Sequence, residues 1–349
     1  MKLQELFINK EMQIKDAIKR LDETAKKILL VVEENKLVGV LTDGDIRRWI
    51  LKNGSLKEPV NIIMAKNPKF IFKKDEKNAK KILKEQSIEA IPVVDEKNEV
   101  IDIIFWNDNF NKKLNYTKMN NPVVIMAGGK GTRLEPYTNI LPKPLIPIGD
   151  IPIVERIINR FAEYGCDDFY MTVNYKKNMI KAYFSEIEKN YTLNYIDEDK
   201  PLGTAGSLYL LKDKIKDTFF LSNCDILIEG NYSDMLKYHK EHRAKITLIT
   251  SLKHYTIPYG VIKINGNSDV RKMEEKPEYD FLVNTGMYIL EPEVLNDIPE
   301  NKFFHITELI NSYIEKGEKI GIYPISEGSW LDMGQFKEME IMLERLGIK

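Results

Sequence analysis

The chain of 349 residues is predicted to fold as an α/β sandwich with a largely parallel sheet from about residue 121 onward, preceded by a smaller α+β unit over residues 1–116. Three observations lead to this prediction. Strand-like and helix-like segments alternate through the second part, two segments of similar design occur in the first part, and the polar residues 111–120 separate the two. With 43% hydrophobic residues, a chain of this length can bury two separate cores.

The first part contains an internal repeat. Residues 27–48 and 88–110 each predict a strand, a turn, a second strand and the start of a helix. Each is preceded by an amphipathic helical stretch, IKDAIKRLDET in the first case and NAKKILKEQSI in the second. The two copies define a repeat of about 60 residues.

The second part alternates regularly. The predicted elements are a strand at residues 123–127, a helix at 153–165, a strand at 167–175, a helix at 177–189, a strand at 193–197, an apolar run at 218–228 and a last amphipathic helix at 333–347. Open parallel sheets bind ligands beyond the carboxyl ends of their strands. We therefore expect the functional residues in the loops that follow these strands.

Composition excludes several classes of function. The 52 lysines and arginines nearly balance the 53 aspartates and glutamates, so no overall field attracts nucleic acid or an anionic membrane, and any phosphate site must be local. The two cysteines, Cys166 and Cys224, have no metal-ligand spacing and indicate a reducing, cytoplasmic location. No leader peptide and no apolar run of about 18 residues is apparent, so no membrane span is expected.

Two histidines on a predicted helix were weighed as a metal site. His239 and His242 are three residues apart and could share a zinc ion, but no third ligand candidate is apparent in the sequence. The favoured interpretation is a solvated helix face.

The first predicted strand of the second part runs into AGGKGTRLEP, a glycine-rich turn that ends in an arginine. Gly128, Gly129 and Gly131 allow close approach of the backbone to a ligand and direct N–H groups at phosphate oxygens. The turn fits neither GxxxxGK[ST] nor GxGxxG, and alone it is equally well explained as a simple turn.

The next segment, LPKPLIPIGDIPIVE, favours a phosphate site because two prolines flank Lys143 and restrict its backbone. An arginine and a lysine that converge on one phosphate suit in-line nucleotidyl transfer, since negative charge builds on the α-phosphate and on the leaving pyrophosphate.

Together, GGKGTRLEPYTNILPKPLIPI resembles the signature of the sugar-1-phosphate nucleotidyltransferases, which include glucose-1-phosphate thymidylyltransferases and mannose-1-phosphate guanylyltransferases. PLGTAGSL, EKP, NTGMYIL and WLDMG resemble further motifs of this family in the same order. The resemblance implies a Rossmann-like nucleotidyltransferase sandwich with a mixed, largely parallel sheet, whose substrates are a nucleoside triphosphate and a sugar 1-phosphate.

The resemblance also implies roles for individual residues. The catalytic residues are Arg133, Lys143 and Asp225. The nucleotide is bound by Met126, Gly128, Gly129, Gly131, Thr132, Arg133, Glu198, Gly203 and Thr204. The sugar phosphate is bound by Gly260, Glu275, Lys276 and Asn284, and a magnesium ion (Mg2+) is held by Asp225 and Asp332.

The segment around Asp225 departs from the family at one position. Asp225 closes an apolar run and is expected at the carboxyl end of a strand, where ligands bind. The family commonly has glycine where this chain has Cys224, and a cysteine fits only if the backbone there does not need a positive φ.

The base is predicted from the loop DEDKPLGTAG. Glu198 lies three residues before Pro201, where the guanylyltransferases resemble one another in carrying a glutamate, whereas the thymidylyltransferases favour a glutamine. A carboxylate accepts hydrogen bonds from N1–H and the amino group of guanine together. We therefore expect GTP rather than dTTP, with a solvated charge in an acidic loop as the alternative for Glu198.

The segment VVEENKLVGVLTDGDIRR resembles a cystathionine-β-synthase (CBS) motif, and residues 1–116 resemble a CBS pair. In such modules a threonine or serine and an aspartate three residues later hold the ribose and phosphate of an adenine nucleotide, and Thr42 and Asp45 match. The second repeat has Phe105 and Asp108 at these places, so one ligand site at most is expected. The alternative is a dimerisation platform, and a homo-oligomer is expected.

A CBS pair with a guanylyl-type loop resembles the CBS-containing guanylyltransferases of bacterial legionaminic acid biosynthesis, which use glucosamine 1-phosphate to make GDP-glucosamine. The alternatives are a mannose- or glucose-1-phosphate nucleotidyltransferase, an inactive nucleotide-sensing regulator and a glycosyltransferase. The PKP and EKP segments favour a sugar phosphate as acceptor over glycosyl transfer.

Overall fold

The structure is a computed structural model that describes residues 2–24, 26–85, 88–106, 117–266 and 269–348. The chain forms two compact units, Met1–Thr117 and Lys118–Lys349. None of the helices in these ranges is long and apolar enough to cross a membrane.

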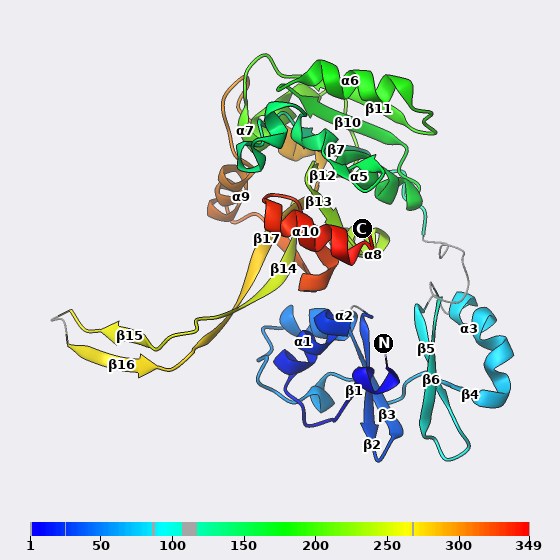
Figure 1. The fold of residues 1–349 in the computed structure, drawn as a ribbon. Helices are drawn as coiled ribbons and strands as arrows, with labels where there is room; N and C mark the ends of the chain where they lie inside the picture. Colours follow the sequence, from blue (N-terminus) through cyan, green and yellow to red (C-terminus); the bar gives the residue numbers. More distant parts are fainter. Residues whose placement is uncertain (1, 25, 86–87, 107–116, 267–268, 349) are drawn as a thin grey trace. The chain divides into compact units, whose positions relative to one another are not determined.

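The first unit contains two three-stranded sheets of the same topology (Figure 1). The first sheet contains β1 (Phe7–Ile8), β2 (Ile28–Glu33) and β3 (Lys36–Thr42), and the second contains β4 (Ile71–Phe72), β5 (Ala90–Val94) and β6 (Val100–Phe105). In each sheet the first strand runs parallel and the third antiparallel to the middle strand. The helices are α1 (Ile14–Thr24), α2 (Asp43–Ile50) and α3 (Ala79–Glu85). The predicted repeat of two strands after a helix is therefore confirmed, whereas the end of the second copy, residues 107–110, lies outside the described residues.

The second unit is built on a seven-stranded sheet of order β11-β10-β7-β12-β17-β14-β18. Its strands are β7 (Val123–Ala127), β10 (Asp168–Val173), β11 (Thr192–Asp197), β12 (Phe219–Asn223), β14 (Ile246–Thr256), β17 (Glu278–Leu290) and β18 (Ile320–Ile325). The first four run parallel, whereas β17 is antiparallel to both of its neighbours. The mixed, mostly parallel sheet confirms the predicted fold class.

Helices cover both faces of this sheet. Successive residues of a strand point to opposite faces, so neighbouring apolar residues of β12 pack against different helices. On one face, Phe161 of α5 (Ile153–Glu163) packs against Phe220 of β12, with ring centroids 5.3 Å apart. On the other face, Leu221 shares a buried cluster with Leu309 of α9 (Ile306–Glu315). The remaining helices are α6 (Lys177–Glu186), α7 (Gly203–Gly206), α8 (Tyr232–His242) and α10 (Phe336–Arg345).

Short elements complete the chain. The small two-stranded sheets are formed by β8 (Pro147–Ile148) with β9 (Ile151–Pro152), β13 (Ile226–Ile228) with β19 (Trp330–Asp332), and β15 (Val261–Ile264) with β16 (Val270–Glu274). The 3-10 helices are η1 (Leu3–Leu6), η2 (Val60–Ile62), η3 (Lys73–Asn78), η4 (Thr132–Leu134), η5 (Tyr137–Asn139), η6 (Lys143–Leu145), η7 (Ser207–Leu211), η8 (Pro292–Asp297) and η9 (Glu327–Ser329).

A two-stranded arm projects from the sheet (Figure 1). Strand β18 pairs with β14 only as far as Ser251, but β14 and β17 stay paired beyond this point, and β15 and β16 form the outer end. We refer to residues 252–282 as the arm. This arm was not among the elements predicted from the sequence.

The solvated-face interpretation is wrong for His239, which is fully buried on the inner face of α8. Its Nδ1 lies 2.7 Å from Thr247 Oγ1 and its Nε2 lies 3.0 Å from Glu291 Oε1. Burial lowers the pKa of His239. Position 239 follows buried positions 232, 235 and 236 at helical spacing, and this pattern indicates a core-facing residue. His242 is exposed and stacks on Tyr238.

Candidate active site

Four parallel strands end close to one edge of the sheet. Val173 lies opposite both Ala127 and Asp197, and Asn223 lies opposite Met126. The loops that follow these strands therefore begin at the same edge, which is where open α/β sheets bind ligands. They carry the glycine-rich turn, Glu198 and Asp225.

Glu198 is buried directly beneath the glycine-rich turn. Its carboxylate accepts a hydrogen bond of 3.3 Å from the N–H of Leu202, and only 5% of the residue is exposed. A Cβ at Gly128 would lie 2.7 Å from Glu198 Oε1, so a larger residue there would displace the carboxylate. Burial raises the pKa of Glu198. The alternative of a solvated loop charge is therefore wrong.

In the rest of the glycine-rich turn, Gly131 is closely packed, whereas the space around Gly129 is open. Gly131 has a φ of +69°, and a Cβ there would lie 3.0 Å from Lys143 Cβ, so the left-handed backbone brings the turn against this lysine. Around Gly129 the space is open. Thr132 and Arg133 are exposed in η4. Their side chains are accessible to a ligand.

Lys143 and Asp225 form a buried ion pair. Pro142 directly precedes η6, which begins at Lys143. The ammonium group of Lys143 donates a hydrogen bond to Asp225 Oδ2. Asp225 follows β12 by two residues, so it lies at a strand's carboxyl end, as predicted. Cys224 is not among the described residues with positive φ, so a cysteine fits here, and burial raises its pKa to about 12.

Asp332 is joined to Asp225 through a short ladder. Strands β13 and β19 pair antiparallel with Ile226 opposite Asp332, and the N–H of Met333 donates to the carbonyl of Asp225 at 2.8 Å. The N–H of Gly334 donates to Asp332 Oδ1 at 2.8 Å. Burial, and next the negative charge of Asp225, raise the pKa of Asp332.

These two carboxylates fit a magnesium ion that is shared with a substrate. Magnesium is typically held by one or two carboxylates together with phosphate oxygens. Burial is the main cause of the raised pKa of Asp332, and a divalent cation would offset the second cause, the negative charge of Asp225. Among the described residues no group of three or more His, Cys, Asp or Glu side chains is arranged to hold a metal alone.

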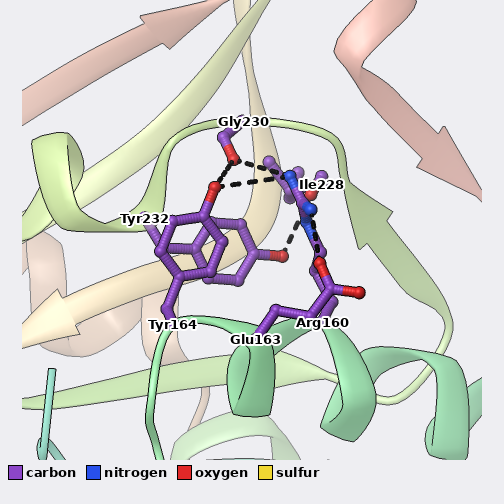
Figure 2. Close-up of polar contacts among 6 residues, drawn as sticks. All are labelled: Arg160, Glu163, Tyr164, Ile228, Gly230 and Tyr232. Carbon is purple, nitrogen blue, oxygen red and sulfur yellow. Dashed lines mark hydrogen bonds and ion pairs between the residues drawn. The ribbon is translucent and has the colours of Figure 1, made fainter. Parts of the chain in front are cut away.

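A polar and aromatic cluster fixes the chain just beyond Asp225 (Figure 2). Arg160 Nη2 and the Tyr164 hydroxyl both donate to the carbonyl of Gly230, at 3.0 and 2.9 Å. The Tyr232 hydroxyl donates to the carbonyl of Ile228 at 3.0 Å, and the rings of Tyr164 and Tyr232 stack with centroids 5.0 Å apart. The cluster holds the end of β13 against α5, and β13 begins directly after Asp225.

Asn284 lies near this edge, on the same strand as Gly286, which packs closely against Asn223. Gly286 has a φ of +89°, and a Cβ there would lie 2.4 Å from Asn223 Nδ2. Asn284 Oδ1 accepts from the N–H of Gly286 at 3.1 Å, and its Nδ2 donates to the Tyr288 hydroxyl at 2.6 Å.

The PLGTAG loop packs on the start of α9. A Cβ at Gly203, where φ is +81°, would lie 2.7 Å from the carbonyl oxygen of Phe304. The Thr204 hydroxyl accepts from the N–H of Ile306 at 3.0 Å and lies 3.3 Å from His305 Nδ1. Gly203 and Thr204 are thus held by residues 304–306 at the start of α9, which were not predicted to belong to the site.

Gly260, Glu275 and Lys276 lie on the arm, Gly260 between β14 and β15 and the other two between β16 and β17 (Figure 1). A Cβ at Gly260 would lie 3.1 Å from Glu275 Oε2, so these two residues are neighbours. Lys276 has a φ of +44°, an uncommon conformation for a residue with a side chain. Glu275 and Lys276 are exposed.

In the first unit, Thr42 and Asp45 form the N-terminal cap of α2. Thr42 Oγ1 donates to Asp45 Oδ2 at 2.7 Å, and the N–H of Thr42 donates to the same oxygen at 2.9 Å. Phe105 packs against the core of the first repeat, and Lys26 Nζ lies 4.5 Å from its ring centroid. Asp108 lies outside the described residues.

A family profile described as "Nucleotidyl transferase" matches residues 122–344, and a profile described as "CBS domain" matches residues 1–52. The chain belongs to the nucleotidyl transferase family. Its N-terminal unit contains a CBS domain. The chain is 33% identical to the mannose-1-phosphate guanyltransferases of Schizosaccharomyces pombe and Saccharomyces cerevisiae, over 225 residues and 62% of its own length. It spans 61% and 62% of the length of these two relatives.

Solved structures of two proteins share the fold. HddC from Yersinia pseudotuberculosis is 23% identical, with a TM-score of 0.52 over 65% of this chain and 99% of HddC. HddC has also been crystallised in complex with GMP-PN; that structure is 22% identical, with a TM-score of 0.51 over 65% of this chain and 99% of that chain. A putative glucose-1-phosphate thymidylyltransferase from Bacillus anthracis is 20% identical, with a TM-score of 0.51 over 64% of this chain and 94% of that one. At these identities the likeness concerns the fold alone.

Proposed function

We propose that the chain transfers GMP from GTP to a sugar 1-phosphate, with magnesium, and releases pyrophosphate. An oxygen of the sugar phosphate attacks the α-phosphorus of GTP in line, and the bond from the α-phosphorus to the bridging oxygen breaks. A phosphate oxygen is already anionic at neutral pH, so no general base is required. The observation that carries the proposal is the meeting of the glycine-rich turn, the Lys143–Asp225 pair and Asp332 at one sheet edge.

Each residue has a separate task. Arg133 and the N–H groups of the glycine-rich turn stabilise the departing pyrophosphate, and Lys143 stabilises the charge that builds on the α-phosphate. Asp225 and Asp332 would hold magnesium, whose positive charge would stabilise the negative charge of the reacting phosphates. Lys276 binds the sugar phosphate, while Asn284, Glu275 and the backbone of Gly260 bind sugar hydroxyls.

Guanine is the proposed base because of Glu198. Its carboxylate is buried under the glycine-rich turn, and a buried acceptor discriminates strongly between bases that do and do not donate to it. The named guanyltransferase relatives support the same choice.

Glucosamine 1-phosphate is the sugar substrate that we propose, on the architectural resemblance of a CBS unit joined to a guanylyl-type catalytic unit. The second candidate is mannose 1-phosphate, because the relatives with 33% identity are named mannose-1-phosphate guanyltransferases.

A matrix of nucleotides and sugar 1-phosphates tests the proposal. GTP, dTTP, ATP and UTP are each combined with the 1-phosphates of glucosamine, mannose and glucose in magnesium, and pyrophosphate is measured. We expect the highest kcat/KM for GTP with glucosamine 1-phosphate. If kcat/KM were highest with mannose 1-phosphate, mannose 1-phosphate would take the place of glucosamine 1-phosphate as the proposed substrate. If it were highest with dTTP, the proposed role of Glu198 would be contradicted. Absence of pyrophosphate in every combination would favour the inactive nucleotide-sensing regulator.

For the first unit we propose a regulatory role with an adenine nucleotide as ligand and no part in the chemistry. Thr42 and Asp45 are the proposed contacts, although their hydrogen bonds already cap α2. Calorimetric titration of ATP, AMP and GTP into the full chain and its Asp45→Ala variant tests this. We expect ATP or AMP to release binding heat with the wild-type chain but not with the Asp45→Ala variant. If only GTP released heat, through the catalytic unit, the dimerisation role alone would remain for the first unit.

A further inference from the structure

The two carboxylates proposed to hold magnesium are carried by a short ladder. Asp225 directly precedes β13, and Asp332 is the last residue of β19. The ladder consists of three residue pairs, in which Ile226 lies opposite Asp332 and Ile228 lies opposite Trp330. A shift of this register by one residue would turn Asp332 to the other face of the ladder. So short a two-stranded ladder is marginally stable by itself and requires support from outside.

The far end of β13 is held by two side chains of the segment that ends α5 (Figure 2). Arg160 lies in the last turn of α5, and Tyr164 directly follows the helix. Both donate to the carbonyl oxygen of Gly230, two residues beyond β13, at 3.0 Å from Arg160 Nη2 and 2.9 Å from the Tyr164 hydroxyl. Arg160 Nη2 also lies 3.4 Å from the Tyr164 hydroxyl. We refer to Arg160, Tyr164 and the Gly230 carbonyl as the clamp.

The clamp lies largely away from solvent. Tyr164 is fully buried, and the side chain of Arg160 is 20% exposed. A hydrogen bond from a charged donor is roughly twice as strong as a neutral one, and the low dielectric of the interior strengthens it further. Because two donors share one carbonyl, either donor is able to hold the end of β13 when the other is absent.

The same helix holds the segment that carries Lys143. Arg156, in the first turn of α5, donates from Nε to the carbonyl of Ile148 at 2.6 Å, and Ile148 follows Lys143 by five residues. The ammonium of Lys143 in turn pairs with Asp225. A closed path of contacts therefore runs from Lys143 through α5 and the clamp to β13, and back through Asp225 to Lys143.

We infer that Arg160 and Tyr164 are positioning residues for the reaction. The clamp holds β13 in register with β19, so that Asp225 and Asp332 face the reacting phosphates at a fixed spacing from each other and from Lys143. Neither clamp side chain is required to contact a substrate, because both act through a backbone carbonyl. The roles of the aspartates and of Lys143 are those of the proposed function, on which this inference rests.

A double substitution tests the clamp. Tyr164→Phe keeps the ring that stacks on Tyr232 and removes one donor, and Arg160→Met keeps the length of the side chain and removes the other. Each single variant leaves one donor on the carbonyl, so kcat is expected to fall only severalfold. In the double variant kcat is expected to fall about tenfold to a hundredfold, more than the product of the single effects, since a displacement of about 1 Å at a reaction centre has this cost. The KM for the sugar phosphate is expected to stay nearly unchanged.

Two variants control for a general loss of stability, with activity measured well below the Tm of every variant. Tyr183→Phe removes a hydrogen bond of 2.5 Å to Glu155, which also lies on α5, and is expected to leave kcat unchanged. Tyr164→Phe combined with Arg160→Lys keeps a cationic donor near the carbonyl and is expected to recover most of the kcat that the double variant loses. Wild-type kcat in the double variant would overturn the inference.

Hydrogen–deuterium exchange provides a readout that depends on neither activity nor magnesium. The N–H of Met333 donates to the carbonyl of Asp225, and the N–H of Glu229 donates to the carbonyl of Ser329, each at 2.8 Å. Both amides are expected to exchange faster in the double variant than in the wild type, because a ladder released from the clamp opens more often.

The N–H of Lys245, which donates to the carbonyl of Lys319 at 2.9 Å, is the reference for opening of the whole unit. Exchange of the ladder that is unchanged relative to this reference would overturn the inference, and so would faster exchange with an unchanged kcat. If the double variant does not fold, the same comparison is made with Tyr164→Phe, for which a smaller acceleration is expected.

The two readouts separate this inference from the proposed function. If the wild-type chain releases no pyrophosphate with any pair of substrates, the proposed function fails, and exchange still decides whether the clamp holds the ladder. If the wild-type chain is active and the double variant matches it in kcat and in exchange, the positioning role alone fails.

Discussion

At the sheet edge, Glu198, Lys143 and Asp225 are buried and held by neighbouring groups, whereas on the arm Glu275 and Lys276 are exposed. The edge is fixed by register between parallel strands, and the arm by a two-stranded ladder alone. Catalysis by preorganised charge requires groups that do not reorganise during the reaction. The residues proposed for the nucleotide side are thus held in place by the fold, whereas Glu275 and Lys276, which are proposed for the sugar phosphate, are exposed.

The largest effect is expected at the prebuilt edge. Asp225→Asn keeps the shape of the side chain but removes the charge that would hold magnesium and that now pairs with Lys143. We expect kcat to fall about a thousandfold, the scale seen when a preorganised electrostatic contact at a reaction centre is lost. Steady-state pyrophosphate release measures it, with the fully exposed Asp213→Asn as the matched control. Near-normal turnover of both Asp225→Asn and Asp332→Asn in magnesium would show that the metal assignment is wrong.

On the arm, Lys276→Ala is expected to act mainly on binding. Loss of a charge-assisted hydrogen bond to the sugar phosphate is expected to raise its KM about tenfold to a hundredfold, with the KM for GTP nearly unchanged. Lys263→Ala, on the charged face of the same arm, is the control. If the substitution weakened only the binding of GTP, Lys276 would belong to the nucleotide side. The proposed division of roles between the sheet edge and the arm would then be wrong.

A smaller change is expected from Glu198→Gln, which preserves the close contact with Gly128. The amide replaces one acceptor by a donor that faces the donors of guanine, so kcat/KM for GTP relative to ATP is expected to fall about tenfold. Competition between the two nucleotides measures the ratio. An unchanged preference would remove the guanine-reading role.

The smallest expected effect concerns stability and pH. The pKa of Asp332 is raised in the folded chain, so the folded state binds its proton more tightly than the unfolded state does. Without magnesium, the contribution of Asp332 to the free energy of unfolding therefore falls as pH rises through the window from its ordinary pKa of about 3.9 to the raised value.

Asp332→Asn is expected to melt a few degrees higher than the wild type at neutral pH without magnesium, and to respond less to added magnesium. Differential scanning calorimetry between pH 4 and 7, with and without magnesium, measures both. A variant that is stabilised by magnesium as strongly as the wild type would contradict the role of Asp332.

The features predicted from sequence are those with a local pattern. The strand at β7 and the helices α5 and α6 follow from apolar periodicity, and Cys224 tolerates its position because its φ is not positive. Burial of Glu198 was not predictable, because it depends on the parallel pairing of β10 with β11 and on the close approach of Gly128. His239 was misjudged because polar residues beside it on α8 masked its inward spacing.

The arm was missed for a different reason. Its strands alternate apolar and charged residues, a pattern that predicts strands but does not reveal whether their apolar face is covered within the same chain. The predicted sugar-phosphate residues were identified by resemblance to motifs, which carry no information on how far apart the fold holds them.

The most direct test of the proposed reaction follows the α-phosphate. Purified chain is incubated with magnesium, glucosamine 1-phosphate and GTP labelled at the α-position, or at the γ-position in a parallel reaction. We expect the α-label to enter a GDP-sugar in a one-to-one ratio with pyrophosphate, which carries the γ-label. Release of the γ-label as inorganic phosphate, or α-label that never enters a sugar product with any sugar 1-phosphate, would contradict nucleotidyl transfer.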